Sequence, residues 1–547
     1  MSEAPLELRT APMTPVEPGR RPPPPLWAGK NVGYVAVRNA SLNRQRRTRE
    51  LSELKGGEVV DVLVVGGGAS GTGIALDAAS RGLSVALIEK RDLAHGTSRW
   101  SSKLIHGGLR YLAKGDIGIA HESAVERGIL MEKTAPHLIR SLPMLTPIGS
   151  GVRRRMVPLT LTGLWAGEAL RVAAGTSSKL LPVPRIIPIE EARGLFGAIR
   201  TAGVRRSLLA YDGQLCDDAR LVIAIARTAA AHGAKILTYC KATSVDGDGA
   251  DVSDEEAGGT FRIRAKHVVN ATGVWADSLA PEIKLGPSKG AHLIFRAERL
   301  GHPEAALLAS VPGTISRFVF FLPQTDGRVY LGLTDDRVDE VEDEARASER
   351  DRRFLLETAN RVLGVPLTER DIVGSYAGFR PLLAAEGADT ADLSRHHQVL
   401  EGANGVLTIV GGKLTTYRKM AEDAVDEIAD RAGVTAGPCQ TRALPLVGAE
   451  QTSTPRRGDA RAEHLHFRYG SEAAAITAMI DDAPALGEPV VEGLPYVRAE
   501  LAWGIEHEGA MNASDLLDRR TRIGLVPEDR RAGLSAATEQ LRSKDGP

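Results

Sequence analysis

The sequence predicts an α/β protein with three parts: a Rossmann-like domain, an antiparallel β-sheet inserted into it, and a helical domain at the C-terminus. Three observations support this prediction. Residues 59–89 read as a strand, a glycine turn, a helix and a second strand. Residues 285–394 contain short β-branched and aromatic runs separated by turn residues. From about residue 440 the pattern is charged and mostly helical.

The first strand and the turn after it carry a dinucleotide-binding motif. Residues 59–65 are apolar and mostly β-branched, which suits a strand buried on both faces of a parallel sheet. Gly66, Gly68 and Gly71 then match G-x-G-x-x-G; such glycines permit the tight turn, the approach of a pyrophosphate and close helix packing. A helix over residues 70–81 would direct its N-terminal N–H groups at that pyrophosphate.

The second strand, expected over residues 84–88, ends in an acid. Glu89 follows Gly68 by about 20 positions, the spacing of the acid that accepts a hydrogen bond from a ribose hydroxyl. This acid argues against NADP, because that cofactor carries a 2′-phosphate. A glycine triplet alone would fit an ordinary strand–helix turn equally well. The surrounding strand, helix and acid are what favour a dinucleotide.

The composition is that of a globular enzyme. Of 547 residues 43% are hydrophobic, and 69 acidic residues balance 69 basic ones; we expect no nucleic-acid partner. Cys216, Cys240 and Cys439 fit neither a disulfide framework nor a metal spacing, so we expect a cytoplasmic protein without a metal. No run approaches the roughly 18 apolar residues of a membrane span. Attachment to a membrane surface remains open.

The predicted domain boundaries follow changes in composition and in secondary-structure pattern along the chain. Residues 1–40 are rich in Pro and Arg, and we expect a disordered extension there. The nucleotide-binding domain is expected to be discontinuous, because strand–helix patterns occur on both sides of the inserted sheet. The predicted ranges are 41–140, 202–284 and 395–435 for this domain, 141–201 and 285–394 for the substrate domain, and 440–547 for a C-terminal helical cap.

The remaining elements are predicted from periodicity, caps and turns. The expected helices are 42–54, 122–133, one capped by Asp217 or Asp218 and running to 232, 344–363, 415–431, 471–480 and 500–507. The expected strands are 235–239, 267–269, 291–295, 318–322, 329–333 and 406–410, with a hairpin turn at 246–249.

Residues 152–174 allow two interpretations. Three arginines at 153–155 precede an apolar stretch that contains Trp165 and Val172 and is interrupted by Glu168 and Arg171. A helix that packs in the core would account for the apolar residues. A basic amphipathic helix at the headgroup level of a membrane would account for the arginines and the tryptophan as well.

Several motifs resemble one family closely. "GGGASGTG" (66–73) and "GTSRWSSKLIHGGLRYL" (96–112) are followed by "NATGVWAD" (270–277), "KGAH" (289–292), "GLTD" (332–335), "GFRPL" (378–382) and "GGKLTTYRKMAE" (411–422). Together they resemble the FAD-dependent glycerol-3-phosphate dehydrogenases and oxidases, over about residues 42–525. The loop after Glu89 and the lysine motif are far more specific than the glycine triplet.

The resemblance implies FAD as the cofactor, bound in an amino-acid-oxidase-like or glutathione-reductase-like fold. It also implies which residues contact the cofactor. These are Gly66, Gly68, Ala69, Ser70, Gly71, Glu89, Lys90, Thr97, Ser98, Ser101, Ser102, Lys103, His106, Gly107, Gly108, Ala271, Gly273, Gly412, Lys413, Leu414 and Thr415. A helix that starts near Lys413 would stabilise the negative charge of a reduced flavin through its N–H groups.

A phosphorylated polyol needs cations for its phosphate and a base for the hydroxyl that loses a proton. Arg110, Arg380, Arg395 and Lys413 are cations at the family's motif positions, and a guanidinium suits phosphate through its planar fork of donors. Taken singly, each arginine fits a surface ion pair better than a phosphate site. Arg380 is the strongest, because apolar residues surround it in the chain.

His292 is the implied base, because an imidazole titrates near neutral pH. The resemblance implies that it takes the C2 hydroxyl proton of sn-glycerol 3-phosphate, with help from Arg380, as C2 passes a hydride to flavin N5. Thr334 and Tyr111 would bind substrate oxygens, and dihydroxyacetone phosphate would be the product. A structural histidine is the alternative for this position.

Other readings of the same motifs remain open. An amino-acid or hydroxy-acid oxidase shares the fold, although a cluster of cations favours phosphate over a single carboxylate. A flavin-dependent sensor would need no substrate motifs. The electron acceptor is expected to be a quinone, reached from the membrane surface through the 153–172 stretch, with oxygen as the alternative. The sequence is compatible with a homodimer.

Overall fold

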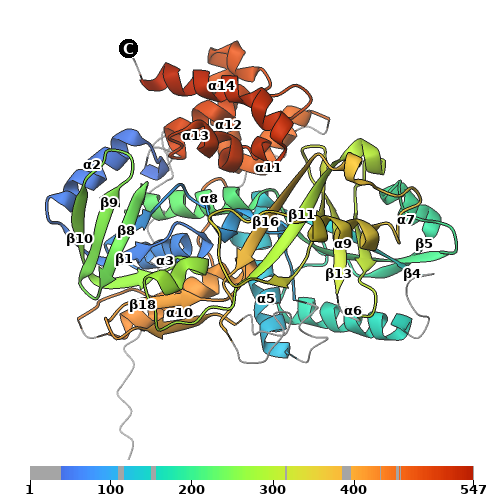
Figure 1. Ribbon diagram of the computed structural model, residues 1–547, viewed down its shortest axis with the longest axis horizontal. Coiled ribbons are helices and arrows are strands. Elements are labelled where there is room, and N and C mark those ends of the chain that lie inside the picture. Colours follow the sequence, from blue (N-terminus) through green and yellow to red (C-terminus); the bar gives the residue numbers. More distant parts are fainter. Residues whose placement is uncertain are drawn as a thin grey trace, which may run out of the picture.

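The structure is a computed structural model, and it describes residues 39–108, 116–148, 156–314, 317–384, 396–431, 433–450, 455 and 458–545. Two sheets lie side by side, and a group of helices covers one end of both (Figure 1). This arrangement confirms the predicted α/β fold with an antiparallel sheet and a C-terminal helical domain. The predicted extension 1–40 lies outside the described residues except for its last two, of which Ala40 is buried.

The first sheet holds the predicted dinucleotide unit at its centre. Its parallel strands run in the order β18, β10, β1, β2 and β7, so β1 is central and parallel as predicted. Antiparallel strands β17, β8 and β9 extend its edges. The bounds are β1 Val59–Val65, β2 Val85–Glu89, β7 Lys235–Thr238, β8 Cys240–Asp246, β9 Gly249–Asp254, β10 Thr260–Asn270, β17 Gln398–Glu401 and β18 Leu407–Val410.

Strand β1 contributes side chains to two cores, and helices cover the face of the sheet that holds the first of them. Val62 and Val64 face α3 (Ala69–Ser80), α8 (Asp218–Ala231) and α10 (Tyr417–Ala429). Val60, Leu63 and Val65 of β1 pack with β8, β9 and α2 (Arg44–Lys55) in a second core. Asp217 is the residue that caps α8, because its carboxylate accepts from the backbone N–H of Ala219 at 2.9 Å.

Gly71 allows α3 to cross β1 closely, and this yields a first prediction. A Cβ at Gly71 would overlap the carbonyl oxygen of Gly66, which is rigid backbone of the turn. Gly71→Ala should therefore lower the free energy of unfolding by about 3 kcal/mol and weaken cofactor binding, as thermal denaturation with and without added FAD would measure. Gly194→Ala is the matched control, because Gly194 sits on the exposed face of α7 (Ile189–Leu195) with no atom near its Cβ position. It should stabilise by about 0.5–1 kcal/mol, and an equal loss in both variants would contradict the prediction.

The second sheet is curled and mostly antiparallel, and its strands come from three separate stretches of the chain. The β11–β16 and β11–β14 pairs form its part nearest the first sheet, and β12 pairs in parallel with β4. The bounds are β3 Leu104–Ile105, β4 Ile139–Ile148, β5 Arg185–Pro188, β6 Arg206–Leu215, β11 Ser288–Arg296, β12 Ala306–Ser310, β13 Phe318–Pro323, β14 Arg328–Gly332, β15 Asp336–Arg337 and β16 Gly374–Arg380.

Three predictions need correction. Residues 206–215 were assigned to the nucleotide-binding domain, but β6 pairs along its whole length with β4 in the second sheet. The helix expected over 344–363 is shorter, because Ser348 and Asp351 form a capping box that starts α9 (Glu349–Ala359). The helix expected over 122–133 starts earlier, as α5 (Ile117–Ile129), and continues into a wider turn to Thr134.

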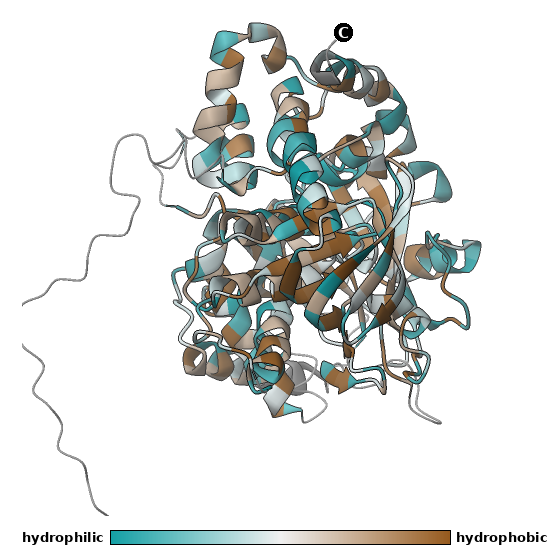
Figure 2. Cartoon of the chain, turned by 90° about the vertical axis from the view of Figure 1, so that its left-hand side faces the viewer, coloured by the Kyte–Doolittle hydropathy of each residue, from teal (hydrophilic) through white to brown (hydrophobic). Residues whose placement is uncertain are grey.

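The C-terminal helices pack around two small cores of their own and against both sheets. Their surface side carries much hydrophilic colour, whereas the strands below them are largely hydrophobic (Figure 2). Buried ion pairs fasten this domain to the rest of the chain, among them Arg227–Glu472 at 2.6 Å and Arg520–Asp92 at 2.5 Å. The helices are α11 Ala460–Tyr469, α12 Ala473–Asp482, α13 Arg498–His507 and α14 Pro527–Asp545.

Helix α6 (Met156–Ala173) corresponds to the ambiguous 152–174 stretch and packs beside α5 (Figure 1). Its Trp165 and Val172 are 63% and 62% exposed, so these two side chains do not pack in the core. Arg171 is buried and pairs with Glu168 at 2.6 Å. The predicted arginines at 153–155 lie outside the described residues. Within the part of the chain that the structure describes, no helix is long and apolar enough to cross a membrane.

Candidate active site

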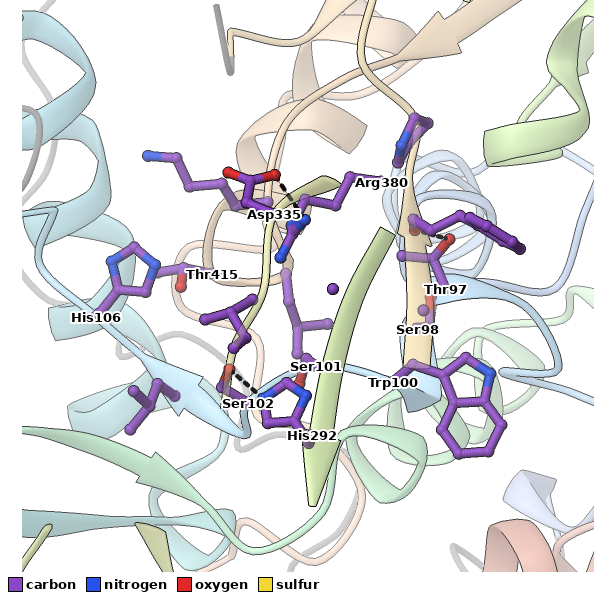
Figure 3. Close-up of a pocket in the computed structure, with 18 of the residues that line it drawn as sticks. Thr97, Ser98, Trp100, Ser101, Ser102, His106, His292, Asp335, Arg380 and Thr415 are labelled. Atoms are coloured by element: carbon purple, nitrogen blue, oxygen red, sulfur yellow. Dashed lines mark hydrogen bonds and ion pairs between the residues drawn. The ribbon is translucent and has the colours of Figure 1, made fainter. Parts of the chain in front are cut away.

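A cavity of about 1900 Å³ lies between the two sheets. Its volume is well above the roughly 300–1,000 Å³ typical of small-molecule pockets, so it can hold a dinucleotide together with a second molecule. The glycine turn between β1 and α3 lines this cavity. Strands β11 and β16 line it as well, through His292 and Arg380 among others (Figure 3). The carboxyl ends of parallel strands are where ligands bind in open α/β sheets.

The glycine turn is shaped for a pyrophosphate. Gly68 precedes α3 without a side-chain cap, so the first N–H groups of the helix are left for a ligand, except that Ala69 donates to Ser98 Oγ at 2.9 Å. The Glu89 carboxylate accepts from the N–H groups of Gly67 and Arg91, at 2.6 and 2.8 Å. Burial raises the pKa of Glu89, and both backbone hydrogen bonds oppose this.

Most of the predicted site residues line this one cavity. They are Gly66, Gly68, Ala69, Ser70, Glu89, Lys90, Thr97, Ser98, Ser101, Ser102, His106, Ala271, Gly273, His292, Thr334, Arg380, Gly412, Lys413, Leu414 and Thr415. They come from both sheets and from the loop after Glu89. Arg110, Tyr111 and Arg395 lie outside the described residues, and their roles stay predictions.

Four predicted cofactor residues do not line the cavity. Lys103 is 2% exposed, and its ammonium pairs with Asp218 at 3.0 Å inside the protein. Gly107 donates its N–H to Asp212 and leaves room for the guanidinium of Arg127, so its role is structural. Gly71 and Gly108 also lie off the cavity wall. The ammonium of Lys103 and the N–H of Gly107 thus have partners within the protein, and their cofactor contacts stay predictions; sequence spacing could not reveal which way these residues face.

His292 projects from β11 into the cavity. Its Nε2 lies 2.9 Å from Ser102 Oγ (Figure 3). Its ring stacks on Tyr376 with centroids 4.5 Å apart. Burial, followed by the charges of Lys103 and Arg380, lowers the pKa of His292 well below its usual value, although Asp218 opposes this. The imidazole is therefore neutral at physiological pH and able to accept a proton.

Arg380 ends β16 on the same side of the cavity. Its guanidinium donates to Ser288 Oγ and Asp335 Oδ1, each at 3.0 Å, and to the carbonyl of Thr334 at 3.2 Å. Its partner strand β11 brings His292 close by, because Ser288 of β11 lies opposite Arg380 in the register. A positive fork beside a neutral imidazole is suited to an anionic substrate that must lose a proton.

Two glycines of the family motifs make room for these side chains. A Cβ at Gly332 would overlap the ring of His292, and a Cβ at Gly290 would overlap the guanidinium of Arg380. Both glycines sit on strands that neighbour the functional residue, at β14 and β11. The glycines of "GLTD" and "KGAH" are thus explained by packing around the two functional side chains.

Thr334 and Lys413 complete the described polar wall. The hydroxyl of Thr334 accepts from the N–H of Ala291 at 3.0 Å, which fixes its position beside β11. The ammonium of Lys413 donates to Ser123 Oγ of α5 at 2.7 Å. The helix predicted to begin near Thr415 starts as a short 3-10 turn at Leu414–Thr416, and α10 follows from Tyr417.

The sequence analysis did not identify three residues at or next to the cavity wall: Asp335, Ser288 and Arg317. Asp335 and Ser288 hold Arg380, and a signal was present, since Asp335 ends the "GLTD" motif and Ser288 directly precedes "KGAH". Arg317 also lines the cavity, but it precedes β13 without any motif that could have identified it. Among the described residues there is no cluster of side chains that could hold a metal ion.

The residues present fit FAD. Gly66 and Gly68 line the cavity at the start of α3 and place no side chain there; a Cβ at Gly66 would also meet the carbonyl oxygen of Ala271 at 2.5 Å. Gly411 and Gly412 adopt φ values of 79° and 74°, which favour glycine, and bring a polar turn against the same cavity. The cavity joins this cradle to the His292–Arg380 pair without interruption.

The fold and this cavity define a class: residues 61–418 match the family described as FAD dependent oxidoreductase. Residues 439–543 match the family described as the C-terminal domain of alpha-glycerophosphate oxidase. Among solved structures, the glycerol-3-phosphate dehydrogenase of Bacillus halodurans complexed with FAD is 28% identical, with a TM-score of 0.70 over 91% of this chain and 94% of that one. An L-alpha-glycerophosphate oxidase of Mycoplasma pneumoniae shares the fold. It is 19% identical, with a TM-score of 0.53 over 71% of this chain and 99% of that one.

Relatives by sequence are more specific. Glycerol-3-phosphate dehydrogenase 1 of Mycobacterium tuberculosis is 48% identical over 92% of this chain and 99% of that protein. Glycerol-3-phosphate dehydrogenase of Synechocystis is 32% identical over 86% of this chain and 90% of that protein. The chain therefore belongs to the FAD-dependent glycerol-3-phosphate dehydrogenase family, and FAD is its cofactor.

Proposed function

We propose that this protein oxidises sn-glycerol 3-phosphate to dihydroxyacetone phosphate and passes the electrons to a quinone. One observation carries the proposal: a neutral imidazole and a guanidinium, His292 and Arg380, share a cavity with the glycine turn that cradles FAD. Loss of a hydroxyl proton and binding of a phosphate dianion are the two tasks that this pair can perform together.

The chain's own residues divide the work as follows. Arg380, fixed by Asp335 and Ser288, holds negative charge on the substrate and favours the alkoxide that forms as the hydroxyl is deprotonated. His292 Nε2 or Nδ1 takes the proton, and the Ser102 hydroxyl orients the ring. FAD, when bound, supplies the two-electron acceptor for the hydride that leaves C2. Lys413, at the glycine turn 411–412, would stabilise the negative charge of the reduced flavin.

The substrate is tested by anaerobic mixing of the purified yellow protein with glycerol 3-phosphate, lactate or an amino acid. We expect bleaching of the flavin absorbance with glycerol 3-phosphate and none with the other two. Bleaching by an amino or hydroxy acid alone would show an oxidase of the same fold. If no compound bleached the flavin, the sensor reading would gain support.

The proposal that a quinone accepts the electrons rests on the surface near α6. Trp165 and Val172 of α6 and Ile117 of α5 are each more than 60% exposed, and the cavity itself is lined by Ile117 and Ala166. An apolar surface that adjoins the cavity would let a lipid-soluble acceptor approach from a membrane to which the protein attaches peripherally. Oxygen remains the alternative acceptor.

Two assays decide between these acceptors: sedimentation with anionic vesicles at low and high salt, and the peroxide yield per glycerol 3-phosphate oxidised. We expect vesicle binding and little peroxide. Val172→Asp should weaken vesicle binding, whereas Leu534→Asp on α14, at another exposed apolar residue, should not. Stoichiometric peroxide without vesicle binding would make the protein an oxidase that uses oxygen.

A further inference from the structure

His292 stands at one end of a row of rings that leads to the C-terminal domain. Its ring lies 4.5 Å from that of Tyr376 with an interplanar angle of 11°, and Tyr376 stacks on Trp100 at 5.7 Å and 23°. Beyond Trp100 comes Arg522, whose guanidinium carbon lies 5.3 Å from the indole ring. A continuous set of contacts therefore connects the cavity to a residue far along the chain.

His292 is held by a hydrogen bond to Ser102, by packing against Gly332 and by the first ring of this row. Its Nε2 pairs with Ser102, but its Nδ1 is buried and has no hydrogen-bond partner in the described part of the chain. One hydrogen bond leaves an imidazole free to turn about the Nε2 contact. The near-parallel ring of Tyr376 restricts that rotation, because tilting the imidazole would break the face-to-face contact.

The loop that supplies Ser102 is held by side chains from three directions. Arg522 donates to the carbonyl of Arg99 at 2.6 Å, and Lys103 donates to that carbonyl and to the carbonyl of Ser101 at 3.2 and 3.1 Å. The hydroxyl of Tyr376 donates to the carbonyl of Ser101 at 3.0 Å. The residues that fix the ring row thus also fix the backbone next to Ser102.

The charges of this anchor are balanced inside the protein. Lys103 pairs with Asp218 at 3.0 Å, and Arg522 lies 3.6 Å from Asp217. All four side chains are at most 3% exposed, so removal of one cation would weaken the pairing of a buried carboxylate, although Arg468 also lies 3.7 Å from Asp217 and Arg522 lies 3.9 Å from Asp218. Arg522 also has a φ of 64°, a backbone conformation that residues other than glycine rarely adopt, and such strain concentrates at functional positions.

We propose that Arg522, Trp100 and Tyr376 are positioning residues, through which the C-terminal helical domain sets the orientation of His292 and Ser102 in the cavity. The inference rests on the proposed role of His292 as the base. It assigns a catalytic purpose to the C-terminal domain, which contributes no side chain to the described cavity wall. Tyr376 and Arg522 do not line the cavity, so they act through the base and its partner, whereas Trp100 also forms part of the cavity wall.

The proposal predicts a specific kinetic signature. Tyr376→Leu and Arg522→Gln should each lower kcat by about tenfold or more with little change in KM, since substrate contacts remain. They should also shift the acid limb of the pH profile of flavin reduction upward, because a ring that admits water regains a pKa nearer to its usual value. Lys103, Arg380 and Asp218, the other charged groups that face His292, are unchanged in both variants.

A second readout is independent of turnover. Hydrogen exchange measured by mass spectrometry should show faster exchange over residues 97–104 in both variants, because their backbone anchors are lost. Tyr376→Phe keeps the ring and should restore most of the wild-type acid limb.

Arg227→Gln is the matched control: it breaks an equally buried ion pair of the C-terminal domain, with Glu472, at a site away from this loop. It should lower Tm without moving the limb or the exchange of 97–104.

The outcomes separate the two proposals. If Arg522→Gln fails to fold, Tyr376→Leu, which leaves the cavity wall unchanged, carries the same predictions. Wild-type acid limbs and exchange rates in folded, flavin-bound variants would overturn the positioning role, as would an equal shift in Arg227→Gln. If glycerol 3-phosphate does not reduce the wild-type flavin, the proposed function fails, while the exchange data still test whether the C-terminal domain anchors the loop.

Discussion

Replacing Arg380 with alanine should lower turnover with glycerol 3-phosphate by about a hundredfold or more while FAD remains bound. The guanidinium makes charge-assisted hydrogen bonds at the cavity wall, and a loss of about 3 kcal/mol in the transition state corresponds to about a hundredfold in rate. Flavin absorbance of the purified variant measures cofactor binding, and anaerobic stopped-flow reduction measures the chemical step.

Two further variants test this prediction more specifically. Arg380→Lys keeps the charge but loses the planar fork, so we expect an intermediate rate. Arg353→Ala serves as the control, because Arg353 lies on α9 with its side chain 68% exposed and pairs with the exposed Glu349. Near-normal reduction in Arg380→Ala would remove Arg380 from the site.

Replacing His292 with glutamine should slow flavin reduction by about 10²–10⁴-fold, the usual contribution of a positioned general base. Glutamine can still bond Ser102 but cannot take up a proton, so substrate binding should change much less than the rate. His232→Gln, at the exposed end of α8, is the control and should react at the wild-type rate. A variant that retained the wild-type rate would mean that another group accepts the proton.

The pH dependence follows from the direction of the pKa shift. The imidazole accepts a proton only when neutral, and burial beside Lys103 and Arg380 lowers its pKa well below 6.5. The wild-type rate should therefore persist as the pH falls through 6.5 and decline only at lower pH, where the ring becomes protonated. An acid limb centred above pH 6.5 would contradict a buried, neutral base.

The sequence by itself determined the nucleotide-binding unit. The apolar run at residues 59–65, the glycine turn and Glu89 predict β1, α3 and β2 within one residue at each end, because strand, turn and helix signals are local. The same is true of the hairpin at 246–249, which joins β8 and β9. Most of the predicted site residues line the cavity, since they lie in loops whose motifs are contiguous in the chain.

The tertiary structure alone decided which residues meet and which way they face. His292 and Arg380 come together because β11 pairs with β16 in a register that places Ser288 opposite Arg380, and no local pattern specifies such a register. Lys103 lies in a loop motif, yet its ammonium turns inward to Asp218. Arg522 reaches Trp100 and the carbonyl of Arg99 from the C-terminal domain, where no motif marks it. The physical reason is that pairing and burial depend on residues distant in sequence, whereas periodicity and turn chemistry act within a few residues of the chain.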